Sequence, residues 1–124
     1  MSSNCSCSCS VAPKFVFSCS GAADVGEIAD QAARALSREG KIKMFCLAGI
    51  GGRVSGIVKS TEAASLVVAV DGCPLNCARK SLEQAGIANV RHVQLQDLGL
   101  KKGESPATAE NIALVTSAVH AFLD

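Results

Sequence analysis

Four of the seven cysteines in this 124-residue chain are spaced so that a single site could use all of them. Cys19, Cys46 and Cys73 follow one another at intervals of 27 residues, and Cys77 comes four residues after Cys73. Thiolates are soft ligands, and four of them suit a tetrahedral zinc ion with Zn–S bonds of about 2.3 Å. Thiolates are also nucleophiles, so the same residues could carry out thiol chemistry without a metal.

The segment Asp71–Cys77, which holds two of these thiols, lies between a strand pattern and a helix pattern. The uniformly apolar run Leu66–Val70 before it is typical of a strand buried on both faces of a sheet. Cys73 is then expected to cap a helix that runs to Gly86, because Pro74 suits a first helical position, where no N–H is needed. Strand ends and helix N-termini converge on ligand crevices in open α/β sheets, so a site is expected here.

Strand and helix patterns alternate along the rest of the chain. Strands are expected at 15–17, 44–47, 66–70 and 90–95, and helices at 24–40, around 54–58, at 73–86 and at 111–123. Such alternation predicts an α/β fold, a small three-layer sandwich with a mainly parallel four-stranded sheet and helices on both faces. All strand ends of one kind then lie on one edge, with neighbouring strands about 4.8 Å apart. We therefore expect Cys19, Cys46 and Cys73 to meet at the carboxyl edge of the sheet.

The first 13 residues differ in composition from the remainder. Residues 1–13 are a cysteine- and serine-rich tail with little to bury, so disorder is expected unless a metal orders it, and residues 14–124 are expected to form one α/β domain. Cys5, Cys7 and Cys9 of the tail form a CxCxC pattern. They could load a metal into the main site, or they could have no fixed role.

Composition excludes several classes of function. Only four residues are aromatic, and 12 basic and 11 acidic residues are dispersed along the chain, so neither base stacking nor a basic stripe for nucleic acid is available. The chain shows no secretory signal and no apolar run long enough for a bilayer, so we expect a cytoplasmic protein with no membrane partner. Thiols stay reduced in that compartment, and an odd number of cysteines does not suit a disulfide framework. Metal ligands or reactive thiols are the better interpretation.

Two aspartates could assist the thiols. Asp71 precedes Cys73 closely enough to tune a ligand or to act as a base, and the alternative is that it caps the turn or helix. Asp97 falls near the end of the fourth expected strand and could face the same crevice, although a solvated turn is the more common setting for such a residue. A single cysteine at a strand end can likewise be no more than a small buried hydrophobic residue.

A glycine-rich run and two histidines are weaker candidates. Gly49, Gly51, Gly52 and Arg53 could form a loop whose N–H groups cradle an anion, or simply a tight turn. His92 is expected in the middle of a strand and His120 late in a helix, neither beside a cysteine in the chain. Filling of the surface or core is the simpler interpretation of both histidines.

These residues resemble those of the DGC-domain proteins, named for a central Asp-Gly-Cys, which stands here as Asp71-Gly72-Cys73. The similarity runs from Cys19-Ser20-Gly21 through Cys46-Leu47-Ala48-Gly49 to Cys77, and it covers the chain from Lys14 to the end. Proteins of that family are described as zinc-binding because they carry four chelating cysteines. The resemblance thus implies the role of zinc ligand for Cys19, Cys46, Cys73 and Cys77, and it implies no reaction.

Three functions remain open at the level of sequence. The leading hypothesis is a protein that holds one zinc ion through the four thiolates and exchanges it with a metal donor or acceptor protein. The alternatives are a thiol-based redox or sulfur-transfer enzyme, for which no catalytic group beyond activated cysteines is found, and an iron–sulfur protein. Because an iron–sulfur cluster uses the same four cysteine ligands, ligand type and number do not separate it from zinc.

Overall fold

A four-stranded parallel sheet forms the centre of the computed structural model, which describes residues 12–123. The strands are β2 (Lys14–Ser18), β3 (Lys43–Met44), β4 (Leu66–Asp71) and β5 (Val90–Gln94). Their order across the sheet is β3-β2-β4-β5, and every neighbouring pair is parallel. The predicted α/β fold with a parallel four-stranded sheet is therefore confirmed.

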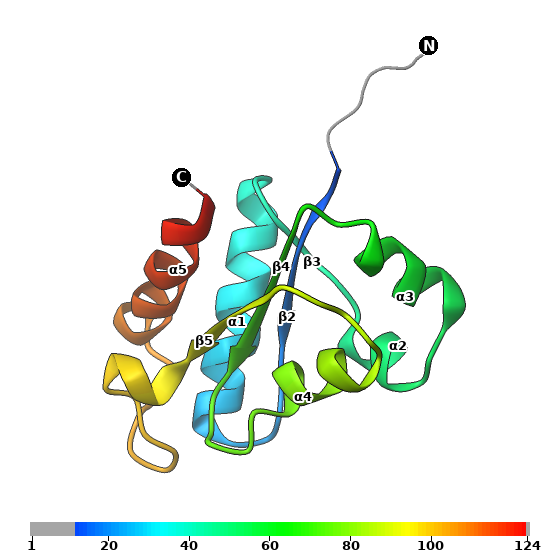
Figure 1. The fold of residues 1–124 in the computed structure, drawn as a ribbon. Coiled ribbons are helices and arrows are strands. Elements are labelled where there is room, and N and C mark those ends of the chain that lie inside the picture. The colour runs from blue at the N-terminus through cyan, green and yellow to red at the C-terminus, as the bar shows by residue number, and fades with distance from the viewer. Residues whose placement is uncertain (1–11, 124) are drawn as a thin grey trace.

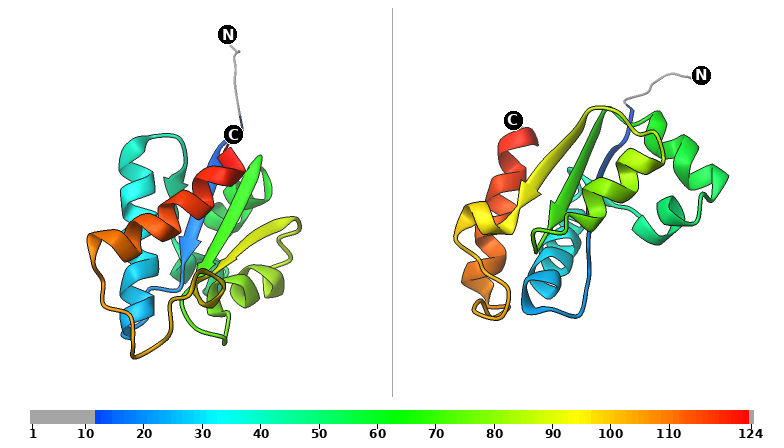
Figure 2. Two further views of the ribbon diagram at one scale, coloured as in Figure 1. Left: turned by 90° about the vertical axis from the view of Figure 1, so that its left-hand side faces the viewer. Right: turned by 60° about the horizontal axis from the view of Figure 1, so that its bottom comes forward.

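Helices cover both faces of the sheet, as Figures 1 and 2 show. They are α1 (Asp24–Glu39), α2 (Leu47–Gly51), α3 (Ser55–Glu62), α4 (Cys77–Gln84) and α5 (Ala109–Leu123), with the 3-10 helix η1 (Leu95–Leu98) after β5. Helices α1 and α5 lie on one face, and α2, α3 and α4 lie on the other. The result is the predicted three-layer sandwich.

Side chains of the central strands point alternately to the two faces of the sheet and pack into two separate cores. On β4, Val68 and Val70 pack into the core beneath α1 and α5, whereas Val67 and Ala69 pack into the core beneath α2 and α4. All four are buried, as expected for a strand covered on both faces. Burial on both sides fixes the register of the strand, because a one-residue slip would exchange the two sets of side chains.

The clearest differences from the expected element boundaries lie around Cys46 and Cys73. The expected strand 44–47 ends at Met44, because Cys46 caps α2 and its Sγ accepts a hydrogen bond from Gly49 N–H. The expected loop at Gly49–Gly52 is accordingly mostly helix. Helix α4 begins at Cys77 and not at Cys73, so Cys73 is not its N-cap.

The late start of α4 has a clear physical cause. The backbone closes a turn in which Asn76 N–H donates to Cys73 O, and Asn76 adopts a left-handed φ of 55°. The Asp71 carboxylate then accepts hydrogen bonds from Ala78 N–H and Arg79 N–H, which are N–H groups of the first turn of α4. Asp71 thus satisfies the helix donors that Cys73 was expected to satisfy.

Within residues 12–123, no helix has both the length and the apolar character that a membrane crossing requires.

Candidate thiol site

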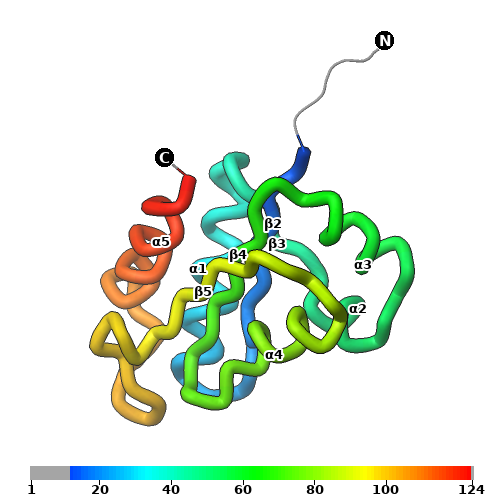
Figure 3. Tube along the Cα trace, viewed as in Figure 1, coloured from blue at the N-terminus to red at the C-terminus, as the bar shows by residue number. Residues whose placement is uncertain are grey.

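The path of the chain through the sheet places a topological switch point between β2 and β4. From β2 the chain passes through α1 to β3 on one side, and it then returns through α2 and α3 to β4 on the other side (Figure 3). Ligands of open α/β sheets bind outside the carboxyl ends of the strands at such a point. Cys19 directly follows β2, and Cys73 lies two residues beyond β4. The candidate site is therefore located at the switch point.

Three of the four predicted cysteines line one cavity at this position. The cavity has a volume of about 490 Å³, and Cys19, Cys73 and Cys77 form part of its wall. Cys19 comes from the β2–α1 connection, Cys73 from the β4–α4 connection, and Cys77 is the first residue of α4. The fold thus brings Cys19 together with two thiols that follow more than 50 residues later in the chain.

The fourth cysteine lines a neighbouring cavity. Cys46 and Cys19 both contribute to the wall of this second space, which has a volume of about 530 Å³. Cys19 contributes to the walls of both cavities, so it is the cysteine that the two spaces share.

Asp30 also lines the second cavity. Desolvation acts to raise the pKa of Asp30, but hydrogen bonds from Arg34 and Ser20 hold that pKa below its ordinary value.

The thiols differ in exposure and in hydrogen bonding. Cys46 and Cys77 are exposed, whereas Cys19 and Cys73 are partly buried. Cys19 Sγ lies 3.3 Å from Gly72 N, which donates to it, and Cys46 Sγ accepts from Gly49 N at the same distance. A negatively charged sulfur accepts such bonds more strongly than a neutral one. Two of the four sulfurs therefore have backbone N–H groups suited to a thiolate.

The four cysteines are suitable ligands for a soft metal ion, but their sulfurs are not arranged around one point in this structure. Among residues 12–123, no three Cys, His, Asp or Glu side chains lie close enough together to hold one ion. Three thiols nevertheless share one cavity wall, with Cys19 and Cys73 on chain connections and Cys77 at the start of α4. Binding of one ion by all of them thus requires these connections to draw the sulfurs inward.

Asp71 is buried, with a relative exposure of 1 %, and its carboxylate is fully engaged. It accepts from Ala78 N at 2.8 Å and from Arg79 N at 3.1 Å, and His92 Nε2 lies 2.9 Å from its Oδ2. The residue caps α4 and does not line either thiol cavity. Its contribution to the site is therefore to fix the start of the helix that carries Cys77.

Two residues of β5 complete this support: His92, which the sequence left as filling of the surface or core, and Gln94, which sequence reasoning did not consider. His92 contacts Asp71, and Gln94 Nε2 donates to Cys73 O at 2.9 Å and to Asn76 Oδ1 at 2.6 Å. The parallel register pairs Asp71 with Gln94, which brings β5 alongside the turn. About 20 residues separate the partners in the chain, so only the strand pairing reveals them. The period-two spacing of His92 and Gln94, which puts both on one face of β5, was the available signal.

Glycines allow the two cysteine-bearing connections to approach each other. A Cβ on Gly72 would lie 2.6 Å from the backbone C and O atoms of Val25, in the first turn of α1. A Cβ on Gly26 would similarly lie 2.5 Å from Gly21 O. Both distances are far below ordinary contact, so no side chain fits. The glycine of Asp71-Gly72-Cys73 thus permits β4 to end directly against α1, beside Cys19.

The remaining predicted residues do not join the thiols. Asp97 is exposed on η1 and lines neither thiol cavity. In the glycine-rich run, Gly49 N–H donates to Cys46 and Gly52 N–H to Ala48 O, while the Arg53 guanidinium donates to Ile50 O. These groups are thus used within α2 and its end. Cys5, Cys7 and Cys9 of the tail lie outside the described residues.

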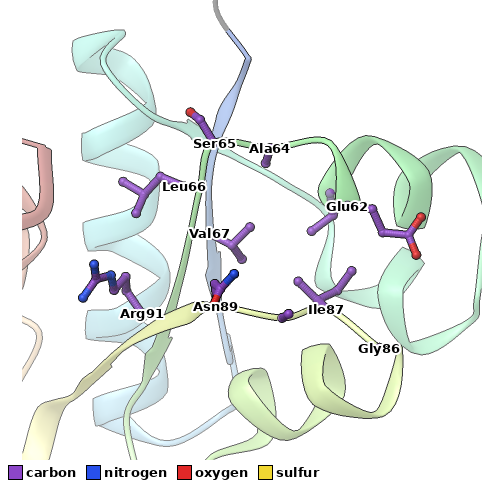
Figure 4. Close-up of a pocket in the computed structure, with 11 residues that line it drawn as sticks. Glu62, Ala64, Ser65, Leu66, Val67, Gly86, Ile87, Asn89 and Arg91 are labelled. Atoms are coloured by element: carbon purple, nitrogen blue, oxygen red, sulfur yellow. The ribbon is translucent and has the colours of Figure 1, made fainter.

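Another cavity lies at the opposite edge of the sheet (Figure 4). Its volume is about 410 Å³, and its wall includes Ser65 and Leu66 at the start of β4 and Ile87, Asn89 and Arg91 around the start of β5. No cysteine among the described residues lines it. The length of the strands therefore separates this cavity from the thiol site.

Comparison with known proteins agrees with the cysteine pattern. Residues 15–119 match the DGC domain, and the chain therefore belongs to the DGC-domain family. It is also similar to the "Anaerobic and virulence modulator AnvM" of Pseudomonas aeruginosa, with 36% identity over 87 residues. The aligned part covers 70% of this chain and 66% of that relative, just under two thirds of its length. No solved structure matches the chain.

Proposed function

We propose that this protein binds one zinc ion through Cys19, Cys46, Cys73 and Cys77. The observation that carries the proposal is the shared cavity at the switch point, whose wall includes three of the four thiols. Cys46 lines the neighbouring cavity together with Cys19 and would complete a set of four. Four thiolates are a common ligand set for zinc, and membership of the DGC-domain family supports the same assignment.

The surrounding residues have distinct tasks in this proposal. Gln94 holds the backbone between Cys73 and Asn76, and Asp71 fixes the start of α4, so these groups position two ligands from the protein side. Cys19 and Cys46 would approach from connections that follow β2 and β3. Bound zinc would supply a soft, exchangeable metal centre at the protein surface.

Such a site suits metal exchange more than structural cross-linking. Two of the four cysteines are exposed, and the cores on the two faces of the sheet are built mainly from aliphatic and aromatic side chains outside the cavity wall. We therefore propose a metal donor or acceptor protein as the partner. The proposal also places the protein in the cytoplasm, since free thiols persist in a reducing compartment.

The proposal is tested by metal analysis of protein purified anaerobically, with reductant and without chelator. We expect about one zinc per chain, and we expect Cys73→Ser and Cys77→Ser to lose it, because each removes one of four ligands. Leu75→Ser is a matched control, since Leu75 lies between these cysteines, lines the same cavity and is exposed. It should retain the metal. Absence of stoichiometric metal in the unaltered protein would refute the proposal.

Iron and acid-labile sulfide are measured in the same samples. Their presence in place of zinc would assign an iron–sulfur cluster to the same ligands, because both centres accept four thiolates.

A second candidate function is thiol redox or sulfur-transfer chemistry. It is favoured by the exposure of Cys46 and Cys77, which leaves both open to oxidants and disulfides. The relative AnvM is named an anaerobic and virulence modulator. If this chain has a modulatory role, a thiol site that responds to oxidants would be a suitable way to carry it out. Thiol titration with and without chelator separates the two functions. Four thiols that react only after chelation indicate a metal, and one fast-reacting thiol indicates thiol chemistry.

A further inference from the structure

We infer that Lys102 makes the thiol cavity selective for negatively charged ligands. The ligand class is a small organic monocarboxylate, with its short apolar body against the alanines and leucine of the wall and its carboxylate toward Lys102. The inference rests on the proposed function only in treating this cavity as the place where the protein acts. It does not require a metal to be bound.

The composition of the cavity wall is the first argument. Apart from the three cysteines and Lys102, the described residues of the wall are glycine, alanine, valine and leucine, including Ala22, Ala23 and Leu75. Lys102 is thus the only residue of that wall with a charged side chain. No ion pair within residues 12–123 involves it. An ammonium group beside apolar walls and without a carboxylate partner attracts anions into the cavity.

The position of Lys102 is set by hydrogen bonds on both sides of it. Gly103 N–H donates to Asp24 Oδ1 at 2.9 Å, and Ser105 N–H donates to Asp24 Oδ2 at 3.1 Å. Before Lys102, Lys101 N–H donates to Ser105 Oγ at 2.8 Å. The loop 101–105 is therefore tied to the first turn of α1, the same turn that contacts Gly72. Lys102 stands over the cavity because the fold holds its loop there.

Asp24 remains ionised under the conditions in which the loop must be held. The N–H groups of Gly103 and then of Ser105 lower the pKa of Asp24 below its ordinary value of 3.8. Asp24 is the first residue of α1, and its Oδ1 accepts a hydrogen bond from Val25 N–H of the same helix at 2.8 Å. The same carboxylate also joins α1 to a loop that follows about 80 residues later in the chain. At neutral pH the loop is thus anchored by a carboxylate.

Lys101 provides a natural comparison. It carries the same charge and is exposed like Lys102, but it does not line the cavity. Replacement of either lysine changes the net charge of the protein equally. Any difference between the two variants therefore reports the local position of the charge and not the overall field.

The test uses iodoacetate and iodoacetamide on reduced, metal-free protein. In both reactions a cysteine thiolate attacks the methylene carbon, a C–S bond forms, the C–I bond breaks and iodide leaves. The reagents are similar in size and differ by one negative charge, so the ratio of their rate constants cancels the reactivity of the thiolate itself. Rates are measured for each cysteine by mass spectrometry, with Cys46 as an internal reference outside this cavity.

We expect Lys102→Gln to lower the iodoacetate-to-iodoacetamide ratio at the cavity cysteines by about threefold at low salt, as two unit charges about 6 Å apart in water would give. Lys102→Glu should lower it by about tenfold, and high salt should reduce both effects. Lys101→Gln and the Cys46 ratio should stay unchanged.

An unchanged ratio in Lys102→Gln would overturn the inference, as would an equal change in Lys101→Gln. Lys102 is exposed and has no hydrogen-bonded side chain among the described residues, so its variants test charge without disturbing the core. Because the measurement is made without metal, failure of the zinc proposal would leave this result unaffected. A threefold effect with no zinc in the protein would support the cavity as an anion site alone.

Discussion

Asp71 and Gln94 fix the turn that carries two thiols, and they do so through different groups. Asp71 accepts two N–H bonds from α4 and contacts His92, whereas Gln94 donates to Cys73 O and Asn76 Oδ1. Neither side chain lines the cavity. Side chains outside the cavity thus hold the backbone of the turn, and the sulfurs remain free to bind or react.

Replacement of Asp71 measures this support. Asp71→Asn puts an amide where two N–H donors require a negatively charged acceptor, and we expect a loss of about 2 kcal/mol in the free energy of unfolding. Urea denaturation at neutral pH measures the change. Asp97→Asn is the matched control, because Asp97 is exposed on η1, and it should change stability by less than about 0.5 kcal/mol. Equal effects of the two substitutions would show that Asp71 does not fix the helix start.

Sequence reasoning at the residue scale selected four cysteines that the fold places at one edge of the sheet, and it missed the residues that support their turn. Spacing and residue type selected the four cysteines, because thiols at strand ends carry their chemistry in the sequence itself. The choice between cap and tuning group for Asp71 stayed open, and its bonds to Ala78 and Arg79 show a cap. His92 was interpreted as filling of the surface or core and Gln94 was not considered, because the partners of both are set by strand pairing and not by nearby sequence.

At the scale of elements, the meeting of β4 with α1 brings the two cysteine-bearing connections together. Gly72 ends β4 against Val25, and Gly26 in the same turn of α1 lies against Gly21 of the preceding connection. Cys19 Sγ accepts from Gly72 N–H at this meeting point. The central glycine of Asp-Gly-Cys thus has a packing role that is distinct from the chemistry of its neighbours.

Gly72→Ala tests the packing role. Its new Cβ would overlap the backbone of Val25, so β4 and α1 must separate, and we expect a loss of about 2 kcal/mol in stability, as for other overpacked sites. Alkylation of Cys19 should also become faster as its Gly72 N–H bond is lost. Both quantities are measured by urea denaturation and by mass spectrometry of iodoacetamide-treated protein.

Gly56→Ala serves as the comparison for this substitution. Gly56 lies in α3, and a Cβ there meets no atom within 4 Å. This variant should gain about 0.5 kcal/mol, since alanine loses less conformational freedom than glycine in a helix. Similar stability for Gly72→Ala and Gly56→Ala would remove the packing explanation.

The order of the strands was the part of the fold that sequence patterns could not provide. Alternating strands and helices predicted a parallel sheet, but several orders share that alternation. The observed order, with β2 and β4 at the centre, alone defines where the switch point lies. The start of α4 was also misplaced, since Pro74 favoured an earlier helix and the buried carboxylate of Asp71 decided otherwise.

At the scale of the whole molecule, the two edges of the sheet are different in character. The carboxyl edge holds the four described cysteines and Lys102 near two cavities. The opposite edge holds Ala12 and the start of β2, together with a cavity that no described cysteine lines (Figure 1). The chain thus enters the sheet at the edge remote from the thiol site.

This arrangement limits what the tail cysteines can do within one molecule. The path from Ala12 to Cys19 is about 23 Å at 3.3 Å per residue. Cys9 and Cys7 precede Ala12 by three and five residues, which even fully extended span only about 10 and 18 Å. Cys5 could span about 24 Å, but only in a straight line back along β2. Within one molecule, Cys7 and Cys9 therefore fall short of the proposed metal site, and Cys5 reaches it only at full extension.

Replacing all three tail cysteines by serine, in an otherwise unaltered chain, tests this conclusion. We expect the triple variant to bind the same amount of zinc per chain as the unaltered protein, and to keep four thiols protected from reagent until chelator is added. Metal analysis and thiol titration are carried out at low micromolar concentration, because a tail that acts on a second molecule would lose its effect on dilution. Loss of zinc at every concentration would show that the tail supplies ligands in its own chain, against the distance limit set by β2.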